Sequence, residues 1–489
     1  MNKESILSEE DRAIIDSIVE QKFNTVAVSG LAVGVVVGNQ THTRTMGYSD
    51  VSTNRLFSDS TVFCAGVLSE AVTASLFLAL QHNYKVSMNT PVAEILNHFS
   101  LSSDTYQNIS VKNLLTQTSG VPKLSVLWDY PNMGDSALYA TTWGIRLLEP
   151  EFQPPGTKVV RSPYNFDIAA DCIEHVSEMS LDKFAKKYMF NPLQMHHSTY
   201  KPVFNGGEDF SKPHQIVDWL TYEYGVVSDY PLNGEHAGSI GWHTSINDAV
   251  RWISMLMNNG QFDGKTILPS KITKLMTSPH YKTNISDAFM GFGLEVKSVD
   301  GLDYYYKTGF TGGFEQSLIM LPSLKTGVVV ITNAVSDFQP EVFAQELISS
   351  IINKVIPKYK TPVHLKMGKV LKTTQSVDSA LLVFEKNRTN DFYDCSDIAL
   401  SQFGMNLHYH LNREEDALKV FQKCVELFPN SAYAHLNLAE YYAANMNYKQ
   451  AEKELYIVKT IENTEFDVKE RVKLVETSID LIKEKENYE

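Results

Sequence analysis

The pattern of the chain changes at about residue 355, and this change constrains the fold more than any other feature. Before it, short apolar stretches of strand length alternate with glycine turns and aromatic residues. After it, the chain is almost entirely helical in pattern and rich in Leu, Ala, Glu and Lys. Two prolines flank a short polar stretch between these parts, so residues 357–365 are expected to be a linker. We therefore predict a mixed domain over residues 12–356 and an all-α domain over residues 366–485.

The second part repeats itself. Ala417 and Ala451 are 34 positions apart, as are Phe421 and Leu455, and Pro429 closes the first unit. This period resembles that of tetratricopeptide repeats. An ordinary amphipathic helical hairpin is the alternative, because apolar residues at helical spacing are often only core.

A third, weaker repeat is expected over Val377–Asn390, with Ala380 and Phe384 on its second helix. Such repeats cannot bury their apolar faces singly, which implies about three units or docking on the first domain. The resemblance implies a protein partner, or self-association through the C-terminal repeats.

Composition excludes several classes of partner. A net charge of −14 and a pI near 5.5 oppose nonspecific nucleic-acid binding, which neutralises phosphates with Lys and Arg. No apolar run approaches the ~20 residues of a membrane helix. The first ten residues carry acids where a signal peptide needs an apolar core. We expect a cytoplasmic protein that binds neither nucleic acid nor membrane.

No cofactor or metal site is expected. The four cysteines form no Cys-x-x-Cys pair and are expected to be free thiols. The chain has no His-Glu-x-x-His pair and no glycine-rich phosphate loop. His196 and His197, like His236 and His243, are more typical of surface or hydrogen-bonding histidines than of metal ligands.

Ordered landmarks in the first part identify a family resemblance. They include the buried-strand pattern of residues 30–38, the segments 109–122, 155–157, 191–195 and 328–333, and Lys307-Thr308-Gly309. Their order resembles the class C β-lactamase, penicillin-binding-protein and esterase group of serine hydrolases. The resemblance implies an α/β (α+β) serine β-lactamase/penicillin-binding-protein-like fold. In this fold an antiparallel sheet is flanked by helices and joined by a helical subdomain.

The nucleophile of that group is missing. In place of its Ser-x-x-Lys motif the chain has Val67-Leu68-Ser69-Glu70, and valine has no lone pair with which to attack a carbonyl. Ser69 lies two positions along, which rotates it by about 200° around a helix and away from the cleft. Cys64 precedes Val67 by about one turn and is expected to be a small buried residue.

The second motif of the group, Tyr-x-Asn or Ser-x-Asn, is also altered. Counting from Pro155 places Arg161-Ser162-Pro163 there, so the tyrosine and the amide are both absent. A slip of three residues brings Tyr164 into the tyrosine position but leaves Phe166 in the asparagine position. The third motif, Lys307-Thr308-Gly309, is intact.

The altered positions differ in charge from the motifs that they replace. Glu70 stands where lysine is usual and Arg161 where tyrosine is usual, while Lys307 remains. We predict that Glu70 lies within about 4 Å of Arg161 or Lys307. The group is either a structural ion pair that plugs the cleft or a new site, with Glu70 as acid/base and a cation that binds an oxyanion.

The candidate catalytic residues are Glu70, Arg161, Lys307 and Tyr164. The residues expected to line the ligand cleft are Val67, Glu70, Arg161, Lys307, Thr308 and Gly309.

Three functions follow from this pattern. The first is a catalytically degenerate protein that binds a ligand or a partner, with a small-molecule or acyl ligand in the cleft. The second is a repurposed enzyme acting on an acyl or cyclising metabolite through Glu70, Arg161 and Lys307. The third is a hydrolase or esterase with a nucleophile that no motif identifies.

Overall fold

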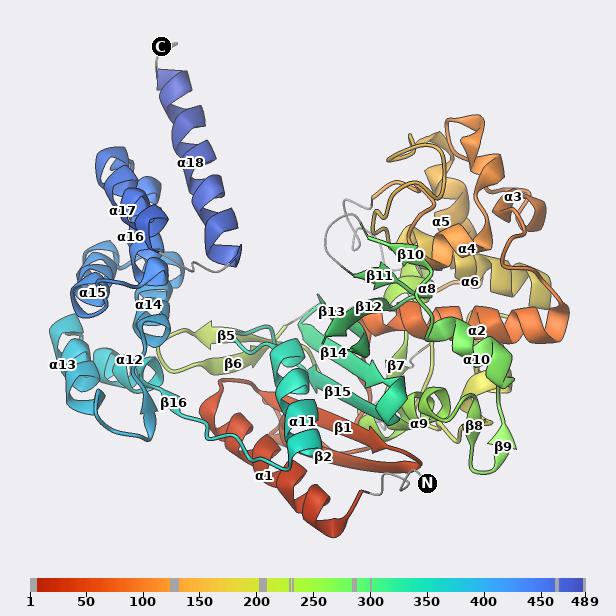
Figure 1. The fold of residues 1–489 in the computed structure, drawn as a ribbon, viewed down its shortest axis with the longest axis horizontal. Coiled ribbons are helices and arrows are strands. Elements are labelled where there is room, and N and C mark those ends of the chain that lie inside the picture. Colours follow the sequence, from red (N-terminus) through yellow and green to blue (C-terminus); the bar gives the residue numbers. More distant parts are fainter. Residues whose placement is uncertain are drawn as a thin grey trace. The chain divides into compact units, whose positions relative to one another are not determined.

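The computed structural model describes residues 7–123, 132–201, 209–227, 230, 233–283, 288–299, 301–461 and 466–486. Residues 1–6, on which the signal-peptide expectation partly rests, lie outside these ranges. The chain divides into two compact units (Figure 1). The first comprises Met1–Phe23, Ala27–Gln215 and Gly225–Pro357. The second, called the helical unit below, comprises Asn24–Val26, Ile216–Tyr224 and Lys358–Glu489.

An antiparallel sheet forms the centre of the first unit. Its strand order is β10-β11-β12-β13-β14-β15-β1-β2-β3. The strand bounds are, in that order, Tyr281–Lys282, Phe289–Met290, Glu295–Val299, Leu302–Thr311, Phe314–Leu321, Thr326–Thr332, Gly30–Val37, Gln40–Asp50 and Arg55–Leu56. Short paired strands accompany it: β4 (Phe63–Cys64) with β7 (His243–Thr244), β5 (His214–Asp218) with β6 (Glu223–Val226), and β8 (Gln261–Phe262) with β9 (Lys265–Thr266).

Helices cover both faces of the sheet. All eight residues of β1 are buried, as expected for a β-branched strand enclosed on two sides. Gly34 lets α9 (Ile246–Met257) approach, since a Cβ there would lie 2.4 Å from a methyl carbon of Val250. The helix α11 (Pro340–Asn353) packs against β14 and β15. The predicted antiparallel sheet flanked by helices is thus confirmed.

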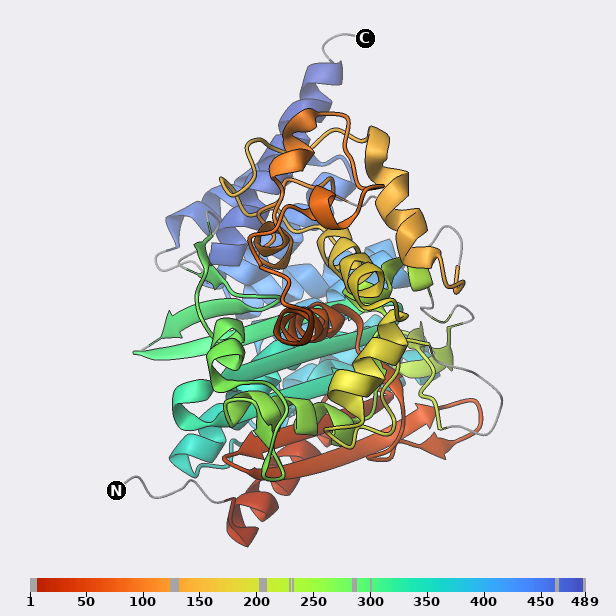
Figure 2. The same ribbon diagram turned by 90° about the vertical axis from the view of Figure 1, so that its right-hand side faces the viewer.

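A helical subdomain packs around α2 (Ser69–Tyr84) and α6 (Tyr164–Ser177), as Figure 2 shows. One core cluster joins residues of α2, α6 and α9 to the sheet. The remaining helices of the first unit are α1 (Glu9–Thr25), α3 (Val92–Ile95), α4 (Val111–Leu115), α5 (Ala137–Gly144), α7 (Leu181–Ala185), α8 (Ala237–Ile240) and α10 (Ser270–Met276).

The helical unit is built from antiparallel helical hairpins. Its helices are α12 (Val363–Thr374), α13 (Val377–Asn387), α14 (Asp397–Met405), α15 (Glu414–Leu427), α16 (Ala432–Ala444), α17 (Tyr448–Thr460) and α18 (Phe466–Glu486). The residues that carry the period, Ala417, Phe421, Ala451 and Leu455, are all buried. Ala380 and Phe384 of the weaker repeat are also buried, on α13. Helix α12 begins at Val363, within the stretch expected to be the linker.

Across the described ranges, no helix is both long and apolar enough to cross a membrane.

Candidate functional site

The position of the missing nucleophile lies in a short 3-10 turn, η1 (Gly66–Leu68), that leads into α2. Gly66 has φ +50°, and a Cβ there would lie 2.4 Å from Thr311 Oγ1. The turn is therefore pressed against β13. Val67 covers Gly309, since a Cβ at Gly309 would lie 2.6 Å from Val67 Cγ2. The structure thus brings Val67 and Gly309 together, with an unreactive side chain at the position of attack.

Glu70 and Lys307 form a buried ion pair. Lys307 Nζ donates to Glu70 Oε2, and each residue is only 6% exposed. The prediction that Glu70 contacts one of the two cations is confirmed. Burial raises the pKa of Glu70, while the charge of Lys307 opposes that rise. The pair therefore neutralises itself inside the protein.

Gln117 bonds to the same oxygen of Glu70 as Lys307 does. Its Nε2 donates to Glu70 Oε2 at 3.4 Å, and its Oε1 accepts from the Ser162 backbone N–H at 2.9 Å and from Asn165 Nδ2 at 2.5 Å. Asn165 in turn accepts a hydrogen bond from Ser119 Oγ at 2.5 Å. Because these buried groups satisfy one another, the carboxylate of Glu70 is held in one orientation.

Arg161 belongs to a different ion pair. It is 62% exposed at its side chain and contacts Glu295 Oε1 of β12 at 2.5 Å. Tyr306 donates its hydroxyl to the other oxygen of Glu295 at 3.1 Å. Of the two cations predicted to approach Glu70, Lys307 is therefore the one in contact, and Arg161 acts on Glu70 through longer-range attraction.

Tyr164 begins α6 and is half-buried, and this burial raises the pKa of its hydroxyl. Beside it lies a histidine–carboxylate pair that sequence reasoning missed. His236 Nδ1 is 2.8 Å from Asp167 Oδ2, and the Tyr164 and His236 ring centroids are 5.9 Å apart. Asp167 is fully buried and also accepts from the Ser239 backbone N–H at 2.9 Å. No local motif signals this pair, because its members lie far apart in the sequence.

The alternative nucleophiles are engaged in structural contacts. Ser69 is buried, donates to the Gly66 carbonyl at 2.6 Å and accepts from the Trp242 backbone N–H at 2.9 Å. Cys64 is buried, and burial raises the pKa of its thiol to about 12. Among the described residues, the hydrogen bonds of both side chains go to backbone groups and not to the activating base that nucleophilic catalysis requires.

Thr308 Oγ1 donates to the backbone carbonyl of Gln316 at 3.1 Å, which ties β13 to β14. Among the residues that the structure describes, no cluster of three or more His, Cys, Asp or Glu side chains has the arrangement of a metal site. The expected surface positions of His196 and His197 are confirmed, since both are exposed.

Two protein families match this chain. The family described as Beta-lactamase matches residues 15–351, and the family described as Tetratricopeptide repeat matches residues 420–453.

Two curated relatives and a solved structure are similar to most of this chain. Protein flp of Staphylococcus aureus (strain MW2) is 23% identical over 357 residues, covering 71% of this chain and 68% of that protein. Unguisins hydrolase ungD of Aspergillus violaceofuscus is 24% identical over 340 residues, covering 63% of this chain and 58% of that protein. The octameric penicillin-binding protein homologue from Pyrococcus abyssi is similar in fold, with a TM-score of 0.59 and 18% identity, over 74% of this chain and 81% of that one.

Proposed function

The chain belongs to the β-lactamase family, and we propose that it is a member that binds a ligand or a partner without forming a serine acyl-enzyme. The observation that carries this proposal is the pairing of Val67 over Gly309 with the buried ion pair of Glu70 and Lys307. A site of this kind has neither the nucleophile nor a free cation at the strand edge. The tetratricopeptide match supports a role for the helical unit in binding protein.

The buried ion pair of Glu70 and Lys307 has the features of a structural contact that fills the cleft. Two charges that are almost fully buried recover their desolvation cost only through each other and through good hydrogen bonds. Glu70 has both, from Lys307 and Gln117. A catalytic acid or base must instead reach the proton that it transfers.

A repurposed enzyme is the second candidate, favoured by one observation. Arg161 is 62% exposed, so its guanidinium can meet an anionic or acyl ligand from solvent. The name of the Aspergillus relative, a hydrolase, favours instead the third function, a hydrolase with a nucleophile that no motif identifies. The buried positions of Glu70 and Lys307 count against their direct participation.

Incubation with a reactive penicillin, cephalosporin or activated ester, followed by intact-protein mass spectrometry, tests the proposal. We expect no covalent adduct on the wild-type protein. Val67→Ser is also expected to remain unacylated, because Glu70 cannot replace the lysine that accepts the serine proton. An adduct on Ser69 or on another residue of the cleft would overturn the proposal, and turnover without an adduct would favour the repurposed enzyme.

A further inference from the structure

Residues 216–224 comprise the end of β5, a turn at residues 219–222 and the start of β6, yet they group with the helical unit. Residues 216–224 therefore belong to the helical unit although they precede its helix α12 by about 140 residues in the sequence. Leu220 is part of the same apolar cluster as buried residues of α12, α14 and α15. The turn at the tip of the β5–β6 hairpin therefore packs on these helices.

A glycine in α12 makes room for the segment. A Cβ at Gly368 would lie 1.9 Å from the carbonyl oxygen of Leu220, so no other residue fits there without a shift. Glycine inside a helix costs about 1 kcal/mol relative to alanine. The close approach of Leu220 supplies a reason for this glycine in the middle of α12.

Aromatic contacts flank this point on both sides. The ring of Trp219 stacks on His410 with centroids 3.6 Å apart and an interplanar angle of 4°. Asn406 Nδ2 donates to the Tyr222 hydroxyl at 2.8 Å, and Asn406 is buried. Asn406 and His410 are the first and last residues of a π-helical turn that continues α14. Such turns are rare and frequently mark functional sites.

A lysine of α12 pairs with acids at both ends of the segment. Lys372 Nζ lies 2.6 Å from Asp218 Oδ2 and 3.1 Å from Glu223 Oε1. These ion pairs are at the surface and add orientation more than energy. The recognised pattern is a leucine between two aromatic residues, with an acid at each end.

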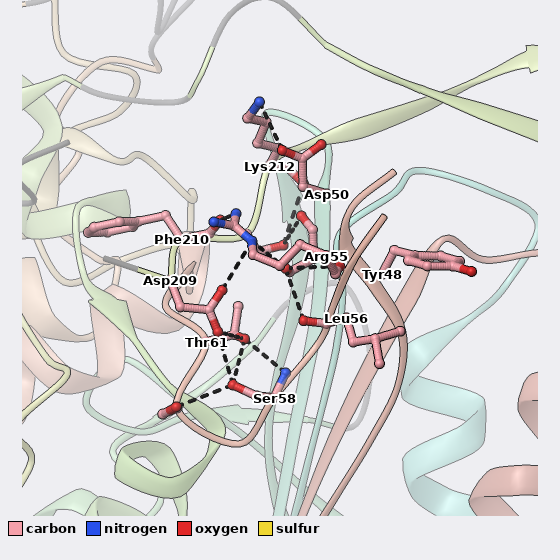
Figure 3. A network of polar contacts seen from close by, with 12 residues as sticks. Tyr48, Asp50, Arg55, Leu56, Ser58, Thr61, Asp209, Phe210 and Lys212 are labelled. Atoms are coloured by element: carbon pink, nitrogen blue, oxygen red, sulfur yellow. Dashed lines mark hydrogen bonds and ion pairs between the residues drawn. The ribbon is translucent and has the colours of Figure 1, made fainter. Parts of the chain in front are cut away.

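The residues just before β5 are anchored by contacts that do not involve the helices of the helical unit. Arg55 of β3 lies 3.3 Å from Asp209 Oδ1 and donates to the Phe210 carbonyl, as Figure 3 shows. Lys212 pairs with Asp50 at 3.0 Å in the same network (Figure 3). Residues 209–212, which lead into β5, are therefore held at the sheet edge whether or not the turn at residues 219–222 is bound to the helices.

We propose that the face formed by Gly368, Lys372, Asn406 and His410 is a docking site for an acidic hairpin peptide whose turn carries a leucine between two aromatic residues, and that residues 216–224 occupy it in cis. This rests on the proposed binding function and names the partner chemistry of the helical unit. A tethered segment has an effective concentration near the millimolar range, so an external peptide competes poorly until the tip is displaced.

The test uses the full chain and a fluorescent cyclic peptide that copies residues 214–226, closed at its ends to keep the hairpin. In the double variant Trp219→Ala, Leu220→Ala the cis segment loses its anchors while the face is intact. We expect the peptide to bind this variant at least about tenfold more tightly than wild type, measured by fluorescence anisotropy. Adding Gly368→Ala to the double variant is expected to return binding to the wild-type level. Equal binding to wild type and double variant, or binding that survives Gly368→Ala, overturns the proposal.

Gly368→Ala alone gives a second, independent reading by hydrogen–deuterium exchange. Alanine favours helix, so α12 is expected to keep its protection while residues 216–224 exchange faster. Unchanged exchange of residues 216–224 contradicts the proposal. This exchange measurement takes the place of the binding test in case the double variant Trp219→Ala, Leu220→Ala unfolds α12 or α14. The β-lactam experiment reads only the cleft, so the two proposals fail separately.

Discussion

At the scale of single residues, the site replaces a reactive motif with a self-contained pair of charges. Glu70 and Lys307 are each buried, and Gln117 donates a second hydrogen bond to Oε2 of the carboxylate. Removing one member of such a pair leaves an uncompensated charge in the interior. Replacing both with apolar side chains of similar size is often neutral or stabilising.

Lys307→Met is expected to lower the free energy of unfolding of the first unit by about 3 kcal/mol, because it leaves Glu70 ionised or forces its protonation. The double variant Glu70→Met, Lys307→Met is expected to recover most of that loss. Urea unfolding of the wild type, both single variants and the double variant measures the coupling.

Surface Arg161 provides the control, since Arg161→Met is expected to change stability by less than about 1 kcal/mol. If the double variant is as unstable as the single variants, Glu70 and Lys307 do not stabilise each other. If instead Glu70→Met keeps its stability and loses binding of a cleft ligand, Glu70 belongs to a new site.

The residues of the cleft were only partly predictable. Lys307 and Gly309 follow from an intact motif, and the pairing of Glu70 with a cation follows from the exchange of charge at aligned positions. The choice between the two cations could not be predicted. It depends on Glu295, which captures Arg161 from a strand 134 positions away in the chain.

At the scale of the elements, the repeat helices are joined by a buried histidine. His435 of α16 is 4% exposed and lies between two acceptors, Glu454 Oε2 of α17 at 2.5 Å and the Pro429 carbonyl at 3.1 Å. Burial alone lowers the pKa of His435, but these two contacts outweigh burial and raise that pKa above 6.5. Nearby, Arg471 of α18 pairs with Glu440 of α16.

The stability of α16 and α17 is therefore expected to depend on pH. A histidine with a raised pKa contributes stability that is fully present below its unfolded pKa of 6.5 and is lost as the pH rises through the folded pKa. We expect the free energy of local opening of these helices to fall by on the order of 1 kcal/mol as the pH rises from 6.5 through the raised pKa of His435.

Hydrogen–deuterium exchange at several pH values, corrected for intrinsic rates, measures this fall. In His435→Gln the dependence is expected to disappear, while the pH response of α12 stays as in wild type. A histidine variant with an unchanged pH profile would show that another group titrates.

The helices were predictable from periodicity where apolar positions recur. Ala417 and Ala451 indicated the hairpins, and both are buried as that period predicts. The π-helical turn at Asn406–His410 was not predictable, because nothing in its composition separates it from the helix before it. Its contacts with Trp219 and Tyr222 come from a distant part of the chain.

At the scale of the whole molecule, the helical unit is discontinuous in sequence. Its apolar cluster draws on Leu220 as well as on residues after Lys358. The pattern change near residue 355 indicates where the repeats begin, but it carries no sign of this earlier contribution. A contact between segments so far apart leaves no local trace in composition or periodicity.

Deleting everything after Lys360 is expected to leave residues 216–224 without their helices. The first unit keeps its own core cluster, so we expect it to remain folded. Cleavage by a protease within residues 216–224 is expected to be at least about tenfold faster than in the full chain. Light scattering on both proteins shows whether the helical unit also mediates self-association. A truncated protein with unchanged cleavage, stability and molar mass, together with no partner captured by the helical unit, would contradict the interaction role.

The discontinuity also matters while the chain is being synthesised. Residues 216–224 leave the ribosome about 140 residues before α12 starts to emerge, which at 5 to 20 residues per second is roughly 7 to 28 seconds. During that interval Trp219, Leu220 and Tyr222 have no helices to cover them. The polar contacts of Arg55 and Lys212 form entirely from earlier residues, so they can hold the root of the hairpin in place through the delay. The nascent protein thus exposes Trp219, Leu220 and Tyr222, on a hairpin whose first residues are already held in place, until the last quarter of the chain has been synthesised.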